Sequence, residues 1–322
     1  LLSILENMKK LFIKILIYSV LILLLLESLV RIFHLTKDYP DRYVDQYGVE
    51  KWVPNQSGYS VTGIRRQNVS EYHINNFGYN SYREFKPTKD KIEIALVGDS
   101  FIEGFHQNYN NSIGKKIEKR LPSVEVYEYG YAGYDLADEL HLIHQYKATF
   151  NLIDYVVIGL KFENDLTRYK YGVLEDRMKL ESPLYRSLRQ IKLLVYLQHI
   201  GAFDSARELT RQILSIGKNN NSSKNEDSND FQNKRNLEYI ENFKKLVKTY
   251  GFNKTRFMFL LDKENTPEIF IDYLNTNKYA YIDYSEAFKK AKRSTTLIYD
   301  MHWNNYGRTI ISNLIINYIQ KL

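Results

Sequence analysis

Four polar positions in this 322-residue chain have side chains that together could carry out acyl transfer. Ser100 and Asn164 each follow a short apolar run, and Asp300 stands two residues before His302 near the end of the sequence. A serine hydroxyl is a weak nucleophile until a base lies within hydrogen-bond reach. Histidine can supply that base, a carboxylate can orient the imidazole, and an amide can stabilise a developing oxyanion. These residue types predict a serine-based acyl-transfer site.

Short apolar runs alternate with helical patterns along the body of the chain, and they are the elements that must position these side chains. We expect strands at 92–97, 124–127, 155–160, 256–261 and 279–283. We expect helices at 112–120, 136–150, 237–250, 267–274 and 305–320. Apolar runs bounded by helices are typical of buried parallel strands. The predicted fold is a three-layer α/β/α sandwich with a mostly parallel, flavodoxin-like sheet.

Each candidate block follows one of these strands, the last one after a longer gap. The blocks are GDS at 98–100, GYAG at 130–133, ND at 164–165 and DMHWN at 300–304. In open α/β sheets the reactive groups gather at the carboxyl ends of the strands. We therefore expect the four blocks to meet at one edge of the sheet.

Each block also has a purely structural interpretation. Asp99 and Ser100 are favoured helix N-caps, and for Asp165 capping is the preferred interpretation. Gly130 fits a simple turn, and His302 could be a packed core histidine. The occurrence of all four blocks in order favours catalysis over these separate explanations.

Two further features stay open. Trp303 either packs in the core or stacks on a sugar. His141 and His144 lie three apart on a predicted helix, a spacing that can bind metal, but only Asp138 and Glu139 accompany them. We therefore do not expect a metal site there.

Taken together, the four blocks resemble the SGNH, or GDSL-like, hydrolase superfamily. The matching stretches are GDSF at 98–101, GYAGYD at 130–135, IGLKFENDL at 158–166 and DMHWNNYG at 300–307. The resemblance covers nearly everything from about Gly48 onward, except an insertion at 167–236. It supports the expected fold and implies a serine hydrolase or acyltransferase that needs no cofactor.

The resemblance also implies a role for five residues. Ser100 corresponds to the nucleophile, His302 to the general base and Asp300 to the residue that orients the imidazole. The backbone N–H groups of Ser100 and Gly133 and the side-chain amide of Asn164 correspond to the oxyanion hole. His106 and His73 lie near the expected site without an assigned role.

The spacing of the last block departs from the common family pattern. The superfamily usually has Asp-x-x-His, whereas this chain has Asp-x-His followed by Trp-Asn. This shorter form is similar to the branch that contains alginate and other exopolysaccharide O-acetyltransferases. The similarity implies an envelope or exported carbohydrate as the substrate.

The N-terminal region predicts a membrane anchor. Residues 11–33 contain an apolar run long enough to cross a bilayer as a helix. Lys9 and Lys10 precede the run, and the positive-inside rule then leaves residues 1–10 in the cytoplasm. No small-x-small cleavage site follows, which indicates an uncleaved, single-pass signal anchor in the cell membrane with the body outside the cytoplasm.

Composition divides the remainder of the chain into segments and argues against several kinds of binding site. The segment 34–91 is polar and aromatic, and we expect it to pack on the catalytic domain at 92–322. Within the insertion at 167–236, the stretch 184–216 has a helical pattern and 218–236 is expected to be an exposed Asn-rich loop. A net charge of +7 without a dense basic stripe does not indicate nucleic-acid binding. The absence of cysteine excludes disulfides, thiolate metal sites and cysteine nucleophiles.

The sequence therefore predicts an extracytoplasmic, membrane-anchored serine esterase or O-acyltransferase. It would act on O-acyl groups, most simply O-acetyl groups, of envelope or exported carbohydrate through an acyl-enzyme at Ser100. For transfer, a separate multi-span membrane protein would supply the acyl donor. Two alternatives stay open: a lipid esterase or thioesterase, and a non-catalytic glycan-binding assembly subunit.

Overall fold

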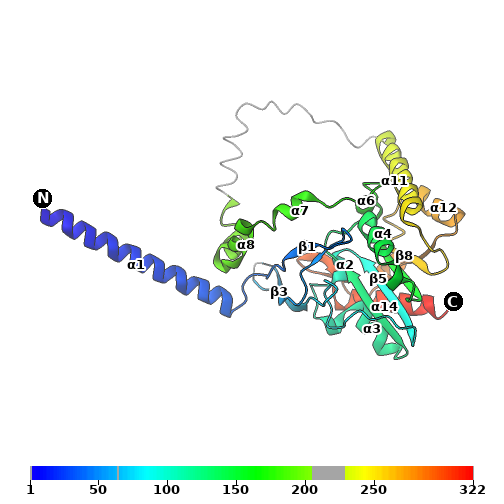
Figure 1. Cartoon of the computed structure of the whole chain (residues 1–322), viewed down its shortest axis with the longest axis horizontal. Coiled ribbons are helices and arrows are strands. Elements are labelled where there is room, and N and C mark those ends of the chain that lie inside the picture. Colours follow the sequence, from blue (N-terminus) through cyan, green and yellow to red (C-terminus); the bar gives the residue numbers. More distant parts are fainter. Residues whose placement is uncertain (1, 64, 205–228, 322) are drawn as a thin grey trace.

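A five-stranded parallel sheet forms the centre of the body, with helices on both faces (Figure 1). The computed structural model describes residues 2–63, 65–204 and 229–321. In spatial order the strands are β6 (Val124–Gly130), β5 (Ile92–Gly98), β7 (Tyr155–Leu160), β8 (Phe257–Leu261) and β9 (Ala280–Asp283). This is the 2-1-3-4-5 order of flavodoxin-like sheets. The predicted fold class and all five strands are confirmed.

Successive residues of β5 point to opposite faces of the sheet and so join two different cores. Ala95 and Val97 pack in one core, and Ile94 and Leu96 pack in the other. The helices of the first face are α4 (Leu136–Gln145), α11 (Asn229–Tyr250) and α12 (Glu268–Thr276). Those of the second face are α3 (Ile113–Arg120) and α14 (Asn305–Ile319). Burial on both sides explains why the inner strands β7 and β8 are almost continuously apolar.

Short elements complete the body around the carboxyl edge of the sheet. They are α2 (Ser100–Glu103), a 3-10 turn (Tyr109–Asn111), α6 (Phe162–Asp165), α13 (Ser285–Lys289), β10 (Thr296–Leu297) and β11 (Asp300–Trp303). α5 (Lys147–Phe150) instead directly precedes β7, at the amino edge. β10 and β11 form an antiparallel pair outside the main sheet. α2, α6 and β11 carry three of the four sequence blocks.

Two helix predictions need correction. The helix expected at 136–150 is broken at Tyr146, which separates α4 from α5. The helix expected to begin at 237 begins at Asn229 instead, so 229–236 is helical rather than part of a loop. This polar stretch has no apolar periodicity of its own, and it continues an amphipathic helix whose apolar residues at 237–250 do reach the core. An ion pair from Arg235 to Glu163, 2.9 Å long, ties the extension to the body.

The insertion contributes three short helices. They are α7 (Glu175–Lys179), α8 (Pro183–Gln190) and α9 (Lys192–His199). The helical pattern expected from 184 is interrupted at Ile191, whose backbone is extended. The remainder of the expected helix and most of the expected Asn-rich loop fall in 205–228, outside the described residues.

The segment between the N-terminal helix and the sheet folds into two antiparallel strand pairs. β1 (Arg42–Val44) pairs with β2 (Glu50–Trp52), and β3 (Ser57–Thr62) pairs with β4 (Asn68–His73). The indole N–H of Trp52 donates to Glu103 at 2.7 Å, and the side-chain amide of Asn80 donates to the backbone carbonyl of Glu103 at 2.9 Å. The segment is thus packed against α2, directly after β5.

The N-terminal helix α1 (Leu2–Ile32) extends away from the body (Figure 1). Its stretch Glu6–Ile32 is long and apolar enough to cross a membrane and contains an 18-residue window with a mean hydropathy of 2.4. Only 6% of that window is buried inside the protein, unlike a core helix.

Candidate active site

Ser100 is presented by a tight connection between β5 and α2. It is the first residue of α2, and Asp99 is the N-cap, whose carboxylate accepts the backbone N–H of Phe101 at 2.9 Å. The capping interpretation of Asp99 is therefore confirmed. Gly104 ends the helix in the left-handed conformation, with φ of 72°. The one-turn helix fixes the serine at the carboxyl end of a central strand.

The structure brings Ser100, His302 and Asp300 into one hydrogen-bonded chain. Nε2 of His302 lies 2.6 Å from Oγ of Ser100, within reach for proton transfer. Nδ1 of His302 is hydrogen-bonded to Oδ1 of Asp300, which also accepts the backbone N–H of His302 at 2.9 Å. Because an ionised carboxylate only accepts, Nδ1 must carry the proton. Nε2 is then the unprotonated nitrogen that faces the serine.

Asp300 is held in its charged form. Burial pushes its pKa upward, but hydrogen bonds from the backbone and ring of His302 outweigh that and hold the pKa of Asp300 below its ordinary value. A charged Asp300 can stabilise a positively charged imidazole when His302 takes a proton.

Trp303 belongs to the core of the site rather than to its surface. Its side chain is buried and packs against Phe101 and Tyr284, with ring centroids 4.9 and 5.5 Å apart. Phe101 also lies against the ring of His302, with centroids 4.5 Å apart. The sugar-stacking alternative for Trp303 is therefore wrong. The residue instead anchors β11 so that His302 meets Ser100.

His106 is a member of the site that the sequence analysis left without a role. Its ring stacks on His302 at a centroid distance of 3.9 Å, and its Nε2 lies 3.2 Å from Oδ2 of Asp300. Burial, followed by the charge of His302, lowers the pKa of His106 to about 4. At neutral pH it is therefore uncharged, with Nε2 facing the carboxylate of Asp300. No sequence motif marks it, since only the fold places it beside β11.

Glu103, which was also missed, connects α2 with two distant segments. Its Oε1 accepts the indole N–H of Trp52 at 2.7 Å and the backbone N–H of Ala132 at 3.0 Å. Complete burial raises the pKa of Glu103 to about 7. A side chain on Gly130 would lie 2.0 Å from the backbone nitrogen of Glu103. Gly130 is therefore a close-packing position at the end of β6 and not the turn residue expected.

The two remaining oxyanion candidates lie on the neighbouring strand ends. Gly133 follows β6 in an exposed loop with φ of 89°, and Asn164 is exposed in α6, which follows β7. β6 and β7 flank β5, so both residues occupy the edge where Ser100 is found. Direct hydrogen bonds join Ser100, His302 and Asp300, whereas Gly133 and Asn164 are brought to the same edge by topology.

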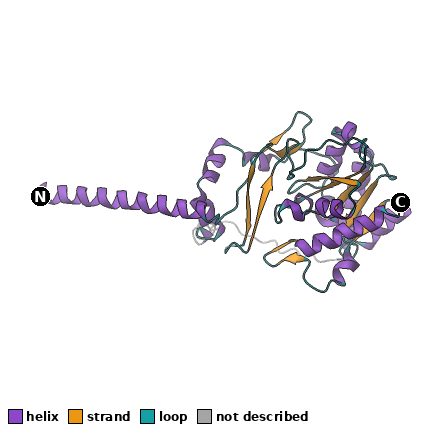
Figure 2. Ribbon diagram, turned by 90° about the horizontal axis from the view of Figure 1, so that it is seen from below, coloured by secondary structure: helices purple, strands orange, loops and turns teal. Residues whose placement is uncertain are grey.

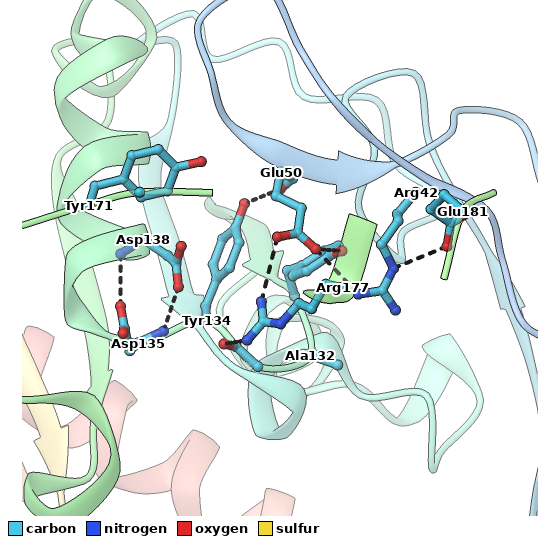
Figure 3. Close-up of polar contacts among 12 residues, drawn as sticks. Arg42, Glu50, Ala132, Tyr134, Asp135, Asp138, Tyr171, Arg177 and Glu181 are labelled. Carbon is cyan, nitrogen blue, oxygen red and sulfur yellow. Dashed lines mark hydrogen bonds and ion pairs between the residues drawn. The ribbon is translucent and has the colours of Figure 1, made fainter. Parts of the chain in front are cut away.

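A polar network holds the glycine loop in place (Figure 3). A guanidinium N–H of Arg177 in α7 donates to the carbonyl of Gly133, and another nitrogen of this group lies 3.6 Å from Oε2 of Glu50 in β2. Glu50 is buried and also accepts the hydroxyl of Tyr131 at 2.6 Å. The insertion and the segment before the sheet thus support the same loop from two sides.

Lys161 places a cation beside the serine turn. Its ammonium lies 2.7 Å from Oδ2 of Asp99 and 3.5 Å from the ring centroid of Phe101. Its backbone N–H donates to the carboxylate of Asp165 at 2.6 Å. Asp165 is the last residue of α6 and Lys161 is its N-cap, so the expected role of Asp165 as a cap residue is wrong, although its side chain does bond to the start of the helix. Burial raises the pKa of Asp165 well above its ordinary value.

A hollow next to Lys161 is lined mainly by polar side chains. It has a volume of about 260 Å³ and contains Asn164 in its wall. The other lining residues are Leu160, Lys161, Phe162, Glu163, Asp262, Asn265, Thr266 and Tyr284. A larger open hollow of about 610 Å³ shares Glu163, Asn265 and Thr266 with it. Polar groups therefore extend outward from the carboxyl ends of β7 and β8.

Within the described part of the chain, one group of three side chains has the spacing of a metal site. It consists of His106, Asp300 and His302, whose ligand atoms all lie within 4.8 Å of one another. His141 and His144 instead contact separate backbone carbonyls, those of Tyr47 and Tyr250. The three-residue group coincides with the hydrogen-bonded chain at Ser100, so an ion there would occupy the atoms that the proposed base needs.

Comparisons with known proteins add distant structural likenesses. No protein-family model and no curated protein matches the chain. A member of the lipolytic protein G-D-S-L family from Veillonella parvula is 13% identical, covers 71% of this chain and 99% of its own, and has a TM-score of 0.40. A lipase/acylhydrolase from Enterococcus faecalis is 11% identical, covers 71% and 95%, and has a TM-score of 0.38. With scores this low, interpretation of the site rests on its own geometry.

Proposed function

We propose that this protein is a membrane-anchored serine esterase or O-acyltransferase that acts outside the cytoplasm on O-acyl groups of envelope or exported carbohydrate. The observation that carries the proposal is the hydrogen-bonded chain from Ser100 through His302 to Asp300. A side chain that only caps a helix has no need of an imidazole whose second nitrogen is bound to a partly buried carboxylate. The three residues together have the geometry that activates a serine.

In the first half-reaction, Nε2 of His302 takes the proton of Ser100 while Oγ bonds to the acyl carbon. The carbonyl electrons move onto oxygen, where the N–H groups of Ser100 and Gly133 and the amide of Asn164 would donate to the oxyanion. As the carbonyl re-forms, the ester C–O bond breaks. His302 then gives its proton to the departing alkoxide oxygen, and an acyl-enzyme remains.

In the second half-reaction, an incoming hydroxyl gives its proton to His302 and attacks the acyl carbon. Ser100 leaves and recovers its proton from the imidazolium. Water as the attacking group makes the protein an esterase, and a sugar hydroxyl makes it a transferase. Asp300 stays ionised in both halves and stabilises the charged imidazole. Transfer requires an acyl donor, for which we propose a separate multi-span membrane protein.

The polar hollow beside Asn164 supports carbohydrate as the acceptor or substrate. Its walls present carboxylates, amides, a lysine and a threonine hydroxyl, which match the dense hydroxyl groups of a sugar chain. The continuation of polar residues into the larger hollow suits a polymer better than one small molecule.

One observation favours a second candidate, a lipid ester or thioester. Ile298, Tyr299 and Met301 are exposed apolar residues next to Asp300 in the β10–β11 pair. An acyl chain could lie against them while its carbonyl reaches Ser100.

Turnover of esters of different chain length separates these candidates. We expect the full chain in detergent to hydrolyse p-nitrophenyl acetate and O-acetylated oligosaccharides, and to lose at least about 1,000-fold in kcat on Ser100→Ala. Selective turnover of p-nitrophenyl palmitate would instead support the lipid candidate. Acetylation of an added oligosaccharide would identify the transferase. Equal activity in wild type and Ser100→Ala would overturn the proposal.

A further inference from the structure

Helix α8 differs from an ordinary surface helix in which of its side chains face the solvent. Arg189 pairs with Glu181 at 2.9 Å and with Asp41 at 3.0 Å, and Arg186 pairs with Glu181 at 3.2 Å. The arginines are thus engaged with carboxylates of the protein. The apolar residues Leu184, Tyr185 and Leu188 are exposed instead.

The exposed residues form one apolar stripe. Leu184 is 67% exposed, Tyr185 49% and Leu188 37%, and Ile191 directly after the helix is 48% exposed. Positions 184 and 188 are one turn apart and lie on the same face of a helix. Single exposed apolar residues are common on proteins, but a continuous stripe next to arginines that are paired within the protein is more typical of a contact surface.

The position of α8 next to α1 indicates what the apolar stripe contacts. The carboxylate of Glu27 in α1 accepts the backbone N–H groups of Lys192 and Leu193 at 3.0 and 2.6 Å, which are the first residues of α9. A guanidinium N–H of Arg31 donates to the carbonyl of Gln190, the last residue of α8. Side-chain and backbone contacts therefore fix the α8–α9 pair at the C-terminal end of α1.

Figures 1 and 2 show the short helices beside the point where α1 joins the body. The apolar stretch of α1 runs to Ile32, and Leu29, Ile32 and Phe33 are themselves exposed. A membrane that contains α1 would reach its surface at this level. The apolar stripe of α8 and the exposed end of α1 would then meet the same boundary between headgroups and acyl chains.

We propose that α8 docks on the surface of the membrane that α1 crosses, with Leu184, Tyr185, Leu188 and Ile191 inserted at the lipid interface. The inference rests on the proposed membrane location of α1 and adds a second attachment point. A single helix lets the body rotate about the helix axis, whereas two attachments fix which side of the body faces the lipid. The occupant of the stripe is a lipid surface.

The absence of cysteine in the sequence allows a direct test with single fluorescent probes. The full chain is reconstituted into vesicles of phosphatidylethanolamine and phosphatidylglycerol, with a nitrobenzoxadiazole dye on Leu184→Cys and a nitroxide quencher on the acyl chains. Leu16→Cys reports on α1. Leu237→Cys is the matched control, because it is 53% exposed on α11, away from α1 (Figure 1).

We expect the Leu184 probe to be quenched severalfold more strongly than the Leu237 probe, and the Leu16 probe to be quenched most. Leu188→Cys should repeat the Leu184 result, which guards against a local effect of one substitution. Strong quenching at Leu16 with equal, weak quenching at 184, 188 and 237 would overturn lipid docking but leave the anchor standing, and would point to a protein partner. Weak quenching at Leu16 as well would overturn both proposals.

Discussion

Each carboxylate oxygen of Asp300 faces a different histidine. His302 is hydrogen-bonded to Oδ1, whereas Nε2 of His106 lies 3.2 Å from Oδ2 and the His106 ring stacks on the His302 ring. The second histidine therefore restricts both the carboxylate and the imidazole that Ser100 requires. We regard His106 as a positioning residue, since the interactions described for it are with His302 and Asp300, through which it would act on Ser100.

The role of His106 can be divided between its ring and its nitrogen Nε2. His106→Phe keeps an aromatic ring against His302 but removes the nitrogen that faces Asp300, and we expect kcat for p-nitrophenyl acetate to fall about tenfold with KM unchanged. His106→Gln keeps a polar amide that can face Asp300 and should recover part of that loss. Steady-state kinetics measure both. A purely structural His106 would instead lower the melting temperature and the active fraction of both variants without the difference between them.

Residue types and order predicted most of this site, whereas its supporting contacts could not be predicted. Ser100 and His302 stand in recognisable motifs after predicted elements, and the fold brings them to 2.6 Å. His106 and Lys161 have no motif, because their positions depend on stacking and ion pairing between segments far apart in the chain. The role of Gly130 was predicted wrongly. The sequence favoured a turn, whereas the residue is a glycine because any side chain there would clash with the backbone of α2. The sequence of one strand does not reveal such a contact.

At the scale of elements, the glycine loop after β6 depends on segments that are far away in sequence. Arg177 in α7 donates to the carbonyl of Gly133, and Glu103 in α2 accepts from the N–H of Ala132. These contacts fix two consecutive residues of the loop. An oxyanion donor on Gly133 is effective only if it is held before the reaction begins.

Removing the contact between α7 and the glycine loop should change kcat more than KM. We expect Arg177→Ala to lower kcat about tenfold, less than the loss of an oxyanion donor itself, with a smaller change in KM. Lys179→Ala is the matched control on the same helix, since Lys179 is exposed and forms an ion pair with the exposed Asp176. Similar kinetics for the two variants would show that α7 does not support the loop.

Strands of the central sheet were predictable because burial on both faces makes them continuously apolar, as in β7. The strand pairs β1–β2 and β3–β4 and the helix α7 were not, because their stability comes from distant partners such as the Trp52–Glu103 hydrogen bond. The early start of α11 was missed for a related reason. Its first turns are polar and are held by continuation of the helix rather than by a buried face.

At the scale of the whole molecule, several carboxyl groups are buried around the carboxyl edge of the sheet. Burial raises the pKa of Glu103, Glu128, Asp138, Glu139 and Asp165. Each of these groups favours its neutral form more strongly in the folded state than in the unfolded state. Their stabilising contribution is therefore greatest at acid pH and is lost as pH rises.

The contribution of Glu103 to this pH dependence of stability can be measured. Its pKa rises from 4.5 to about 7, so its contribution is complete below pH 4.5 and is lost as pH rises through 7. The upper limit of the loss is about 3 kcal/mol, from 1.36 kcal/mol per pKa unit. We expect urea unfolding to show a smaller loss of stability between pH 5 and 8 for Glu103→Gln than for wild type. Glu238→Gln, which changes an exposed carboxylate, is the control; matching curves for wild type and Glu103→Gln would contradict the assignment.

The central claim is that Ser100 becomes covalently acylated with the help of His302. Its most direct measurement is the site and extent of labelling by a fluorophosphonate, read by intact mass and peptide mapping on the full chain. We predict one adduct, on Ser100, with no adduct in Ser100→Ala and labelling at least about 100-fold slower in His302→Ala. Unchanged labelling of Ser100→Ala, or no labelling of a folded wild-type protein, would contradict the account.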